Sequence, residues 1–234
     1  ALEFASPSLK NDEEIVISAV TQNGYALKHA GISLKRNKKI VRAAIKNFCF
    51  SLIFADKKLK KDKNIVLDAI KQSGYSLKYA DKTLRKNKNI VMVAVKKNVF
   101  ALMYADKTIK KDKKFILKAL SKCNWGTFME YIDSKLKKDK EIVEKAVKNW
   151  GMSLQFVNNR FKKDKKIVSK AVNQYCNSLE HAHNLIKKDK NIVLKAIKQN
   201  GFTLQYADES LKKNKSFLIK AVELSGDALS YASE

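Results

Sequence analysis

Apolar residues recur along the chain at the spacing of a short amphipathic helix. After Asp62 they stand at i, i+1, i+4 and i+5, which places them on one helix face: Ile65, Val66, Ala69 and Ile70. Gly74 follows where a glycine at the C′ position ends many helices. The pattern therefore predicts a helix that begins just after Asp62 and ends before Gly74.

A second group of apolar residues follows the glycine at helical spacing. Leu77, Ala80 and Leu84 take positions i, i+3 and i+7, which predicts a second, shorter helix. In other stretches the glycine position holds Gly24, Gly126, Gly151, Gly201 and Gly226, but also Cys49, Val99 and Cys176. Some of the first helices must therefore end without glycine.

This two-helix pattern is a sequence repeat that recurs in tandem along the chain. Its opening Asp or Asn recurs every 25 residues, except that Asp112 and Asp139 are separated by 139 − 112 = 27. The positions are Asp12, Asn37, Asp62, Asn87, Asp112, Asp139, Asp164, Asp189 and Asn214. Seven residues later alanine is invariant, which predicts a close approach of two helices there: Ala19, Ala44, Ala69, Ala94, Ala119, Ala146, Ala171, Ala196 and Ala221.

Self-similarity at this period is typical of a solenoid, because one short helix pair buries its apolar faces only against its neighbours. We expect an all-α fold, an α-solenoid of stacked two-helix repeats, forming a single array over residues 1–234. The two-residue insertion lies in an irregular turn at residues 121–128. Neither end reads as a polar capping repeat, so we expect a fragment of a longer protein.

A basic motif opens each repeat, as in LKKDKEIV from Leu136 to Val143, and most of it is explained as the end of one helix and the start of the next. The Asp or Asn is an N-cap, whose side-chain oxygen accepts from N–H groups of the first turn. The two lysines before it, such as Lys60 and Lys61, end the preceding helix, where positive charge suits the helix dipole.

The lysine that follows the cap has no such explanation, because a cation at a helix N-terminus is unfavourable by about 0.3–1 kcal/mol when exposed. Only Glu13 interrupts this column of first-turn lysines: Lys38, Lys63, Lys88, Lys113, Lys140, Lys165, Lys190 and Lys215. Stacked repeats would line them along one edge, where helix N-termini and lysines together suit anions. They are the candidate binding residues; a solvated, solubilising rim is the plainer explanation.

Aromatic residues form another column, two positions after the leucine that opens the second helix. Its members are Phe4, His29, Phe54, Tyr79, Tyr104, Tyr131, Phe156, His181, Tyr206 and Tyr231. Such a column could stack nucleic-acid bases, but packing between repeats is the better interpretation. His29 and His181 are then partly buried aromatics, and His181 with His183 at i, i+2 makes a poor metal site.

Composition adds a strong positive charge. Lys+Arg is 49 against Asp+Glu 23, a net charge of +26, which favours polyanions or acidic proteins as partners. An AT-rich genome is an alternative source of the lysines. Arginine, the usual reader of base edges, is scarce, which disfavours sequence-specific nucleic-acid recognition: Arg36, Arg42, Arg85 and Arg160.

The three cysteines are odd in number and widely spaced, so neither a disulfide framework nor a zinc site is indicated: Cys49, Cys123 and Cys176. An intracellular, reducing compartment fits this pattern. No apolar run reaches the ~18 residues of a membrane span, and no signal peptide is visible. No phosphate loop, nucleophile elbow or isolated carboxylate pair is present, so we expect no enzymatic activity and no cofactor.

At the level of the unit LxYADxxLKKDKxIVxxAIKQxGxx, the sequence resembles a domain of unknown function that occurs in tandem copies, each about two of these units long. That domain is seen in large proteins of protists, in some large viruses and in secreted effectors of intracellular bacteria. The match covers essentially the whole chain. The resemblance implies a helical repeat region, often accessory to a longer protein, with no catalytic residues to transfer, and a place in the host cytosol if the parent protein is an effector.

Three functions remain open from the sequence. The leading hypothesis is a non-catalytic scaffold that holds a protein partner, acidic in character, on its basic edge. The alternatives are sequence-independent binding of nucleic acid or an anionic membrane surface, with steep salt dependence, and a rigid spacer for another domain.

Overall fold

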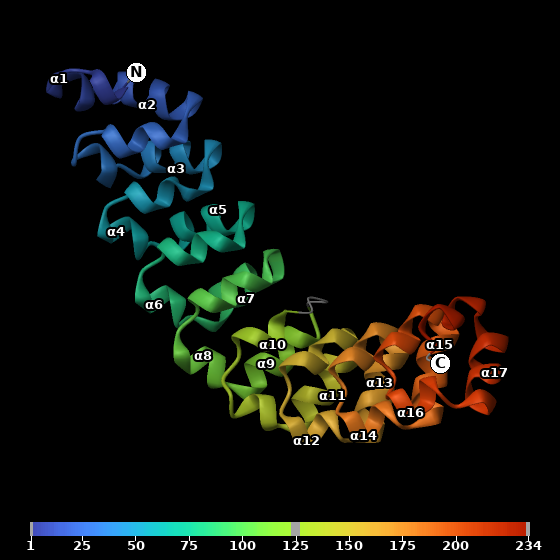
Figure 1. The fold of residues 1–234 in the computed structure, drawn as a ribbon. Coiled ribbons are helices and arrows are strands. Elements are labelled where there is room, and N and C mark those ends of the chain that lie inside the picture. Colours follow the sequence, from blue (N-terminus) through green and yellow to red (C-terminus); the bar gives the residue numbers. More distant parts are fainter. Residues whose placement is uncertain (1, 123–126, 233–234) are drawn as a thin grey trace. The chain divides into compact units, whose positions relative to one another are not determined.

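The computed structural model describes residues 2–122 and 127–232, which form helices and no strand (Figure 1). The chain divides into two compact units, unit 1 at Ala1–Phe115 and unit 2 at Ile116–Glu234. Within each unit the repeats stack in chain order. The predicted all-α solenoid with a 25-residue period is confirmed; that the units join into one array stays a prediction. Of the irregular turn at 121–128, residues 123–126 lie outside the described residues.

The first half of each repeat is an α-helix that begins directly after the Asp or Asn. These helices are α2 (Glu13–Gln22), α3 (Lys38–Asn47), α5 (Lys63–Gln72), α7 (Lys88–Lys97), α9 (Lys113–Leu120), α11 (Lys140–Asn149), α13 (Lys165–Gln174), α15 (Lys190–Gln199) and α17 (Lys215–Leu224). The N-cap prediction is confirmed in every repeat, since each Asp or Asn side chain accepts from first-turn N–H groups. For Asp62 the donor is the Asn64 N–H, at 2.9 Å.

The second half of each repeat is not one helix but a 3₁₀ helix followed by a short helical turn. The 3₁₀ helices are η1 (Leu2–Phe4), η2 (Gly24–His29), η4 (Cys49–Phe54), η5 (Gly74–Tyr79), η6 (Val99–Tyr104), η8 (Gly151–Phe156), η9 (Cys176–His181), η10 (Gly201–Tyr206) and η11 (Gly226–Tyr231), with α10 (Phe128–Tyr131) at the same place in one repeat. The turns are α1 (Pro7–Lys10), η3 (Leu34–Arg36), α4 (Lys57–Lys60), α6 (Lys82–Arg85), α8 (Lys107–Lys111), η7 (Leu136–Lys138), α12 (Asn159–Lys162), α14 (Asn184–Lys187) and α16 (Glu209–Lys212).

The break falls at the alanine that the sequence places inside a single second helix. Ala80 is extended, with φ −69° and ψ 151°. This conformation lets the Asp81 side chain cap α6 through the Thr83 N–H, at 2.9 Å. It also frees the Asp81 N–H to donate to the Lys60 carbonyl of the previous repeat, at 2.9 Å. A hydrogen bond between repeats therefore replaces one within a helix.

The same backbone bond recurs between neighbouring repeats of each unit. In unit 1 it joins Gly31 to Lys10, Asp56 to Lys35, Asp81 to Lys60, and Asp106 to Arg85, and in unit 2 it joins His183 to Lys162 and Asp208 to Lys187, always from N–H to carbonyl at 2.7–3.1 Å. These bonds form a ladder along one side of the stack. The ladder fixes the register of each repeat against the next.

The glycines end the first helices for a different reason from the one that the sequence suggests. No described glycine has a positive φ, and the residue before Gly74 is extended. A Cβ added at Gly24, Gly74 or Gly151 would lie 2.2–2.3 Å from the carbonyl oxygen of the invariant alanine in the next repeat. These glycines are needed for close contact between repeats, and the predicted close approach at the alanine is confirmed.

The core of each unit runs through the stack as continuous apolar columns. The leucine at the centre of the six-residue 3₁₀ helices is completely buried at Leu27, Leu52, Leu77, Leu102, Leu154, Leu179 and Leu204, whereas Leu229 of η11 is 63% exposed. In unit 1 the helices α2, α3, α5 and α7 each pack on the next in this order (Figure 1). Because burial of one leucine contributes about 1.5–3 kcal/mol, this repeated packing is the main force that holds the repeats together.

Candidate basic binding edge

The basic motif divides into three columns with different surroundings. We call the residue two positions before the cap the inner lysine, the residue directly before the cap the pre-cap residue, and the residue after the cap the first-turn lysine, as above. The inner column is Lys10, Lys35, Lys60, Arg85, Lys110, Lys137, Lys162, Lys187 and Lys212, and every member is half-buried. The pre-cap column is Arg36, Lys61, Lys86, Lys111, Lys138, Lys163, Lys188 and Lys213, and every member is exposed.

The inner lysines hold their own repeat together. The Lys60 ammonium donates to the Ile53 carbonyl at 2.6 Å, across the break in the second half of the repeat. The same bond joins Lys35 to Lys28 and Lys110 to Met103, both at 2.7 Å. Burial lowers the pKa of the Lys60 ammonium below its ordinary value. These hydrogen bonds give the inner column a structural role.

The first-turn lysines have a structural partner that sequence reasoning missed. Lys38 pairs with Asp62, the cap of the next repeat, at 2.7 Å, and Lys165 pairs with Asp189 at 2.7 Å. Lys88 pairs with Asp112 in the same way. The Lys38 ammonium is the largest cause that lowers the pKa of the Asp62 carboxyl. Helix dipole arguments alone therefore misjudge this column, because the compensating carboxylate lies on the neighbouring helix.

The remaining first-turn lysines differ in their surroundings. Lys113 has an interaction partner, and Lys140 lies 3.9 Å from Glu144 in its own helix. Lys63 and Lys190 are exposed and face repeats whose cap is asparagine rather than aspartate, and no salt bridge involves either within the described residues. Lys215 is exposed in the last repeat. An aspartate cap in the next repeat allows this pairing, as for Lys38, Lys88 and Lys165, although Lys140, which precedes the repeat capped by Asp164, lies beside Glu144 of its own helix.

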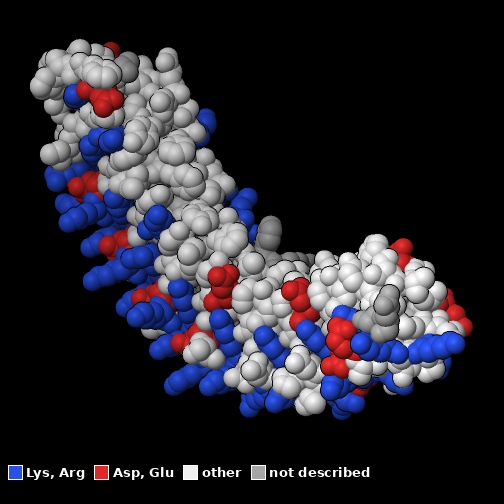
Figure 2. Space-filling view, viewed as in Figure 1, with Lys and Arg blue, Asp and Glu red and all other residues white. Residues whose placement is uncertain are grey.

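The pre-cap residues are exposed and lie at the C-terminal ends of the short turns. In unit 1, Lys and Arg side chains gather along the edge that carries α4, α6 and α8, with acidic groups set between them (Figure 2). Arg36 pairs with Asp56 at 3.2 Å, and Lys188 lies 3.9 Å from Asp208. We call the pre-cap residues and the first-turn lysines together the basic edge. It is a mixed surface with excess positive charge.

One groove opens on the basic edge of unit 2, between α13 and α15. It measures about 510 Å³ and is lined by Lys165, Lys166, Lys170, Asn173 and Asn191. Two of its lysines already have carboxylate partners, since Lys165 pairs with Asp189 and Lys170 with Glu144 at 2.8 Å. The groove is therefore only partly free to attract an anion.

The aromatic column is packing between repeats, as the sequence favours. The Tyr25 ring meets Phe54 of the next repeat edge-on, with centroids 5.0 Å apart. Tyr75 meets Tyr104 at 5.3 Å, and Phe202 meets Tyr231 at 6.2 Å. Edge-to-face pairs of this kind stabilise an interface and use ring surface that a stacked base would need.

The histidines also follow the repeat register. His29 and His181 are half-buried members of the aromatic column, and burial is the largest cause that lowers the pKa of His181. His183 replaces the usual Asp as a cap, because its Nδ1 accepts from the Leu185 N–H at 3.2 Å. Within residues 2–122 and 127–232, no three His, Cys, Asp or Glu side chains are grouped as metal ligands would be.

None of the described helices is both long and apolar enough to cross a membrane. Fold and surface together define a helical-repeat protein with a charged edge. The family model of a domain of unknown function, DUF4116, matches the chain at residues 1–35, 37–85, 65–110, 87–137, 112–162, 139–187 and 189–234. The chain belongs to this family, and a match such as 37–85 spans two of the present repeats. Neither a curated protein nor a solved structure matches it.

Proposed function

We propose that this repeat array is a non-catalytic scaffold that holds an acidic segment of a protein partner along its basic edge. One observation carries the proposal: from Arg36 onward every pre-cap residue is basic and exposed. The inner lysines and several first-turn lysines have structural partners, so the fold itself explains them. Two pre-cap residues also pair with a carboxylate of the next repeat, Arg36 with Asp56 and Lys188 with Asp208, but exposed pairs of this kind contribute little to folding. A binding partner is therefore the function that the pre-cap charges suit.

The spacing of these charges suits an extended acidic segment. Packed helices lie about 8–10 Å apart, so successive repeats would offer one or two cations at each such step. An extended chain rises about 3.3 Å per residue, and every third residue would therefore meet a new repeat. Acidic residues at that spacing are the feature that we expect in the partner.

The test compares two triple variants of the full chain with equal charge change. The first, Lys61/Lys86/Lys111→Glu, reverses three pre-cap residues in unit 1. The control, Lys46/Lys71/Lys96→Glu, reverses three exposed lysines in the last turns of α3, α5 and α7, on the order of 15 Å away along each helix.

Each variant serves as bait in an affinity pull-down from cell lysate at physiological salt, with and without nuclease. We expect nuclease-resistant proteins that bind the native chain and the control but not the pre-cap variant. The scaffold proposal fails if the pre-cap variant retains the same proteins as the control. Circular dichroism of all three chains separates lost binding from lost folding.

The same experiment decides between the other functions. Capture that vanishes with nuclease and weakens steeply with salt assigns the edge to nucleic acid, and retention on anionic vesicles assigns it to a membrane surface. No retained partner at all leaves the array as a rigid spacer. The scaffold proposal carries with it an intracellular, reducing compartment, or the host cytosol for a secreted effector.

A further inference from the structure

Unit 1 carries an exposed apolar surface outside the basic edge. We call it the aromatic strip, and it comes from η2, η4, η5 and η6: Tyr25, Phe50, Ile53, Tyr75, Phe100 and Met103. Four of these side chains are 37–44% exposed, and Phe50 and Tyr75 are half-buried. Contiguous apolar surfaces bordered by polar residues mark places where proteins bind partners.

The aromatic strip is continuous from one repeat to the next. The Phe50 ring contacts Tyr79 of the next 3₁₀ helix, with centroids 6.0 Å apart. The rings of Tyr75 and Phe100 have centroids 6.5 Å apart, and the Tyr75 hydroxyl donates to the Met103 Sδ at 4.0 Å. A partner segment that follows the stack of unit 1 would therefore meet apolar side chains from each of these 3₁₀ helices.

The fold does not require apolar residues at the positions of the strip. Unit 2 is built from the same repeat, and only Met152 and Phe202 are apolar there. The other equivalent positions of unit 2 hold polar side chains: Gln155, Asn177, Glu180, Gln205, Asp227 and Ser230. The central leucine is completely buried in both units, as Leu77 and Leu179 illustrate. Binding therefore explains the exposed apolar side chains of unit 1 better than stability does.

The aromatic strip lies directly beside the basic edge. Lys60, which precedes the pre-cap Lys61, donates to the Ile53 carbonyl at 2.6 Å. The same bond joins Lys110 to Met103 at 2.7 Å. The 3₁₀ helices that carry the strip contain no Asp or Glu, and they contain two lysines: Lys28 and Lys78. A partner that covers both surfaces is therefore acidic on one side and apolar on the other.

We propose that the partner segment on the basic edge is amphipathic, with acidic side chains on the pre-cap residues of unit 1 and apolar side chains on the aromatic strip. This inference rests on the proposed scaffold function and adds the second half of the partner's chemistry. A polyproline II segment returns to the same side every third residue and rises about 3.1 Å per residue, or about 9 Å per turn. Packed helices lie about 8–10 Å apart, so each turn would place one acidic and one apolar side chain on each repeat.

The rings of the strip suit side chains better than nucleic-acid bases. Stacked bases need exposed ring faces in a row, whereas the ring planes of Tyr25 and Phe54 meet at 86°. The Lys28 ammonium also lies over the Tyr25 ring, 5.3 Å from its centre. An aliphatic side chain needs only apolar contact, which the edges and the faces of the rings both supply.

Two labelled peptides of equal length and charge test the inference by fluorescence anisotropy with the full chain. One contains four copies of Glu-Leu-Ser, one for each basic pre-cap residue of unit 1, and the other contains four copies of Glu-Ser-Ser. We expect the leucine peptide to bind at least about tenfold more tightly. A tenfold ratio corresponds to about 1.4 kcal/mol, which is less than the burial of one leucine side chain contributes.

The two peptides also separate this inference from the scaffold function on which it rests. Equal affinities would overturn the amphipathic partner and leave the basic edge as the binding surface. Failure of both peptides to bind, even at low salt, would refute the scaffold function and the inference with it. The Lys61/Lys86/Lys111→Glu variant should lose both peptides.

A double variant removes apolar side chains from the strip without changing the charge. Ile53→Gln/Met103→Gln introduces the residue that unit 2 has at the equivalent positions, Gln155 and Gln205, so the repeat accepts it. We expect this variant to bind both peptides with the affinity that the native chain has for Glu-Ser-Ser. Thermal unfolding checks that the variant remains folded.

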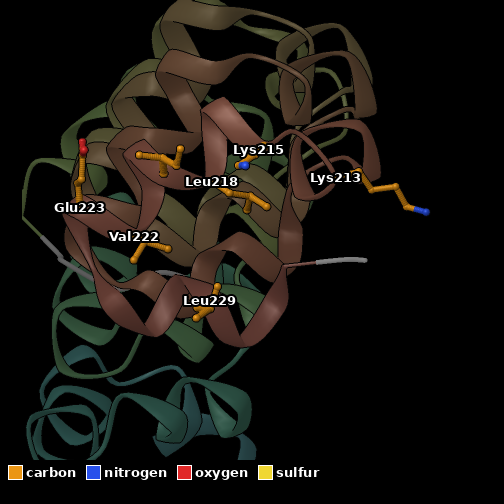
Figure 3. A pocket seen from close by; sticks show the side chains of 7 residues that line it. Lys213, Lys215, Leu218, Val222, Glu223 and Leu229 are labelled. Carbon is orange, nitrogen blue, oxygen red and sulfur yellow. The ribbon is translucent and has the colours of Figure 1, made fainter.

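The matched control makes the same change at an apolar opening of unit 2. Leu218, Val222 and Leu229 line this opening of about 550 Å³, together with Ile219 (Figure 3). Ile219→Gln/Leu229→Gln removes two exposed apolar side chains there and should keep the native preference for the leucine peptide. The inference is overturned if the strip variant keeps that preference or if the control loses it. Oligothymidylate that binds the native chain tightly and the strip variant weakly would assign the strip to nucleic-acid bases and overturn the inference as well.

Discussion

Replacing Gly74 by alanine tests why glycine is needed at this position: to allow close packing between repeats, or to adopt a left-handed conformation at the end of the helix. The new Cβ would lie 2.2 Å from the Ala94 carbonyl oxygen and 3.0 Å from the Asn98 backbone nitrogen. An ordinary C···O contact is about 3.3 Å or more, so the repeats must separate by about 1 Å. Both neighbours are backbone atoms, and neither is the end of a flexible side chain.

We expect Gly74→Ala to lose about 1–3 kcal/mol, the usual cost of overpacking a well-filled interface. For a chain of this size each kcal/mol changes Tm by about 2–4 °C, so the melting temperature should fall by about 2–12 °C. Gly226→Ala is the matched control, because its φ is not positive and its added Cβ meets nothing. There we expect a gain of about 0.4–1 kcal/mol, since alanine restricts the unfolded chain.

Urea and thermal unfolding, followed by circular dichroism at low protein concentration, measure both changes. A left-handed cap at both glycines would make both variants less stable by similar amounts. That result, or a Gly74→Ala chain as stable as the native one, would refute the packing explanation.

Three further predictions follow from contacts between repeats. Lys165→Met should cost about 0.2–1 kcal/mol of unfolding free energy by urea titration, less at high salt, whereas Lys190→Met should cost nothing measurable because Lys190 faces an asparagine cap. Leu179→Ala should cost about 2–5 kcal/mol and Leu229→Ala under about 0.5, and equal losses would contradict the burial of the first and the exposure of the second. The pKa of the Asp62 carboxyl is lowered in the folded chain, so its contribution to the free energy of unfolding is present above the unfolded pKa, near 4, and is lost as pH falls through the folded pKa. Asp62→Asn can still cap the helix, so we expect its stability to fall less steeply in acid than that of the native chain. An unchanged dependence of stability on pH would count against the pair of Asp62 with Lys38.

The sequence was enough to predict what recurs but not what each recurring residue touches. The caps and the invariant alanine were predicted correctly, because a helix start and a close approach are visible in one repeat at a time. The partner of Lys38 was missed because Asp62 belongs to the next repeat, and the dipole of its own helix gives the opposite sign. Gly74 was assigned to the wrong cause for the same reason, since the atom that excludes a side chain is the Ala94 carbonyl.

The interruption of the second helix at Ala80 could not be predicted from the spacing of apolar residues either. Leu77, Ala80 and Leu84 fit a continuous helix by spacing, and an extended alanine leaves no mark in that spacing. What favours the break is a pair of bonds formed by Asp81, one to its own turn and one to Lys60 of the previous repeat. The first-turn lysines were predicted as one column of candidate binding residues, whereas in the structure some pair with an aspartate cap of the next repeat, as Lys38 does, and others face an asparagine cap, as Lys63 does.

The backbone ladder between repeats also bears on how such a protein can change over generations. Its bonds run from an N–H to a carbonyl, so they tolerate nearly any side chain, as Gly31, Asp56 and His183 in one position illustrate. Only proline at the donor position would remove one of these hydrogen bonds, because proline has no backbone N–H. Whole 25-residue units can therefore be duplicated, deleted or exchanged with the joint between neighbours intact, while the exposed residues of each unit are free to diverge.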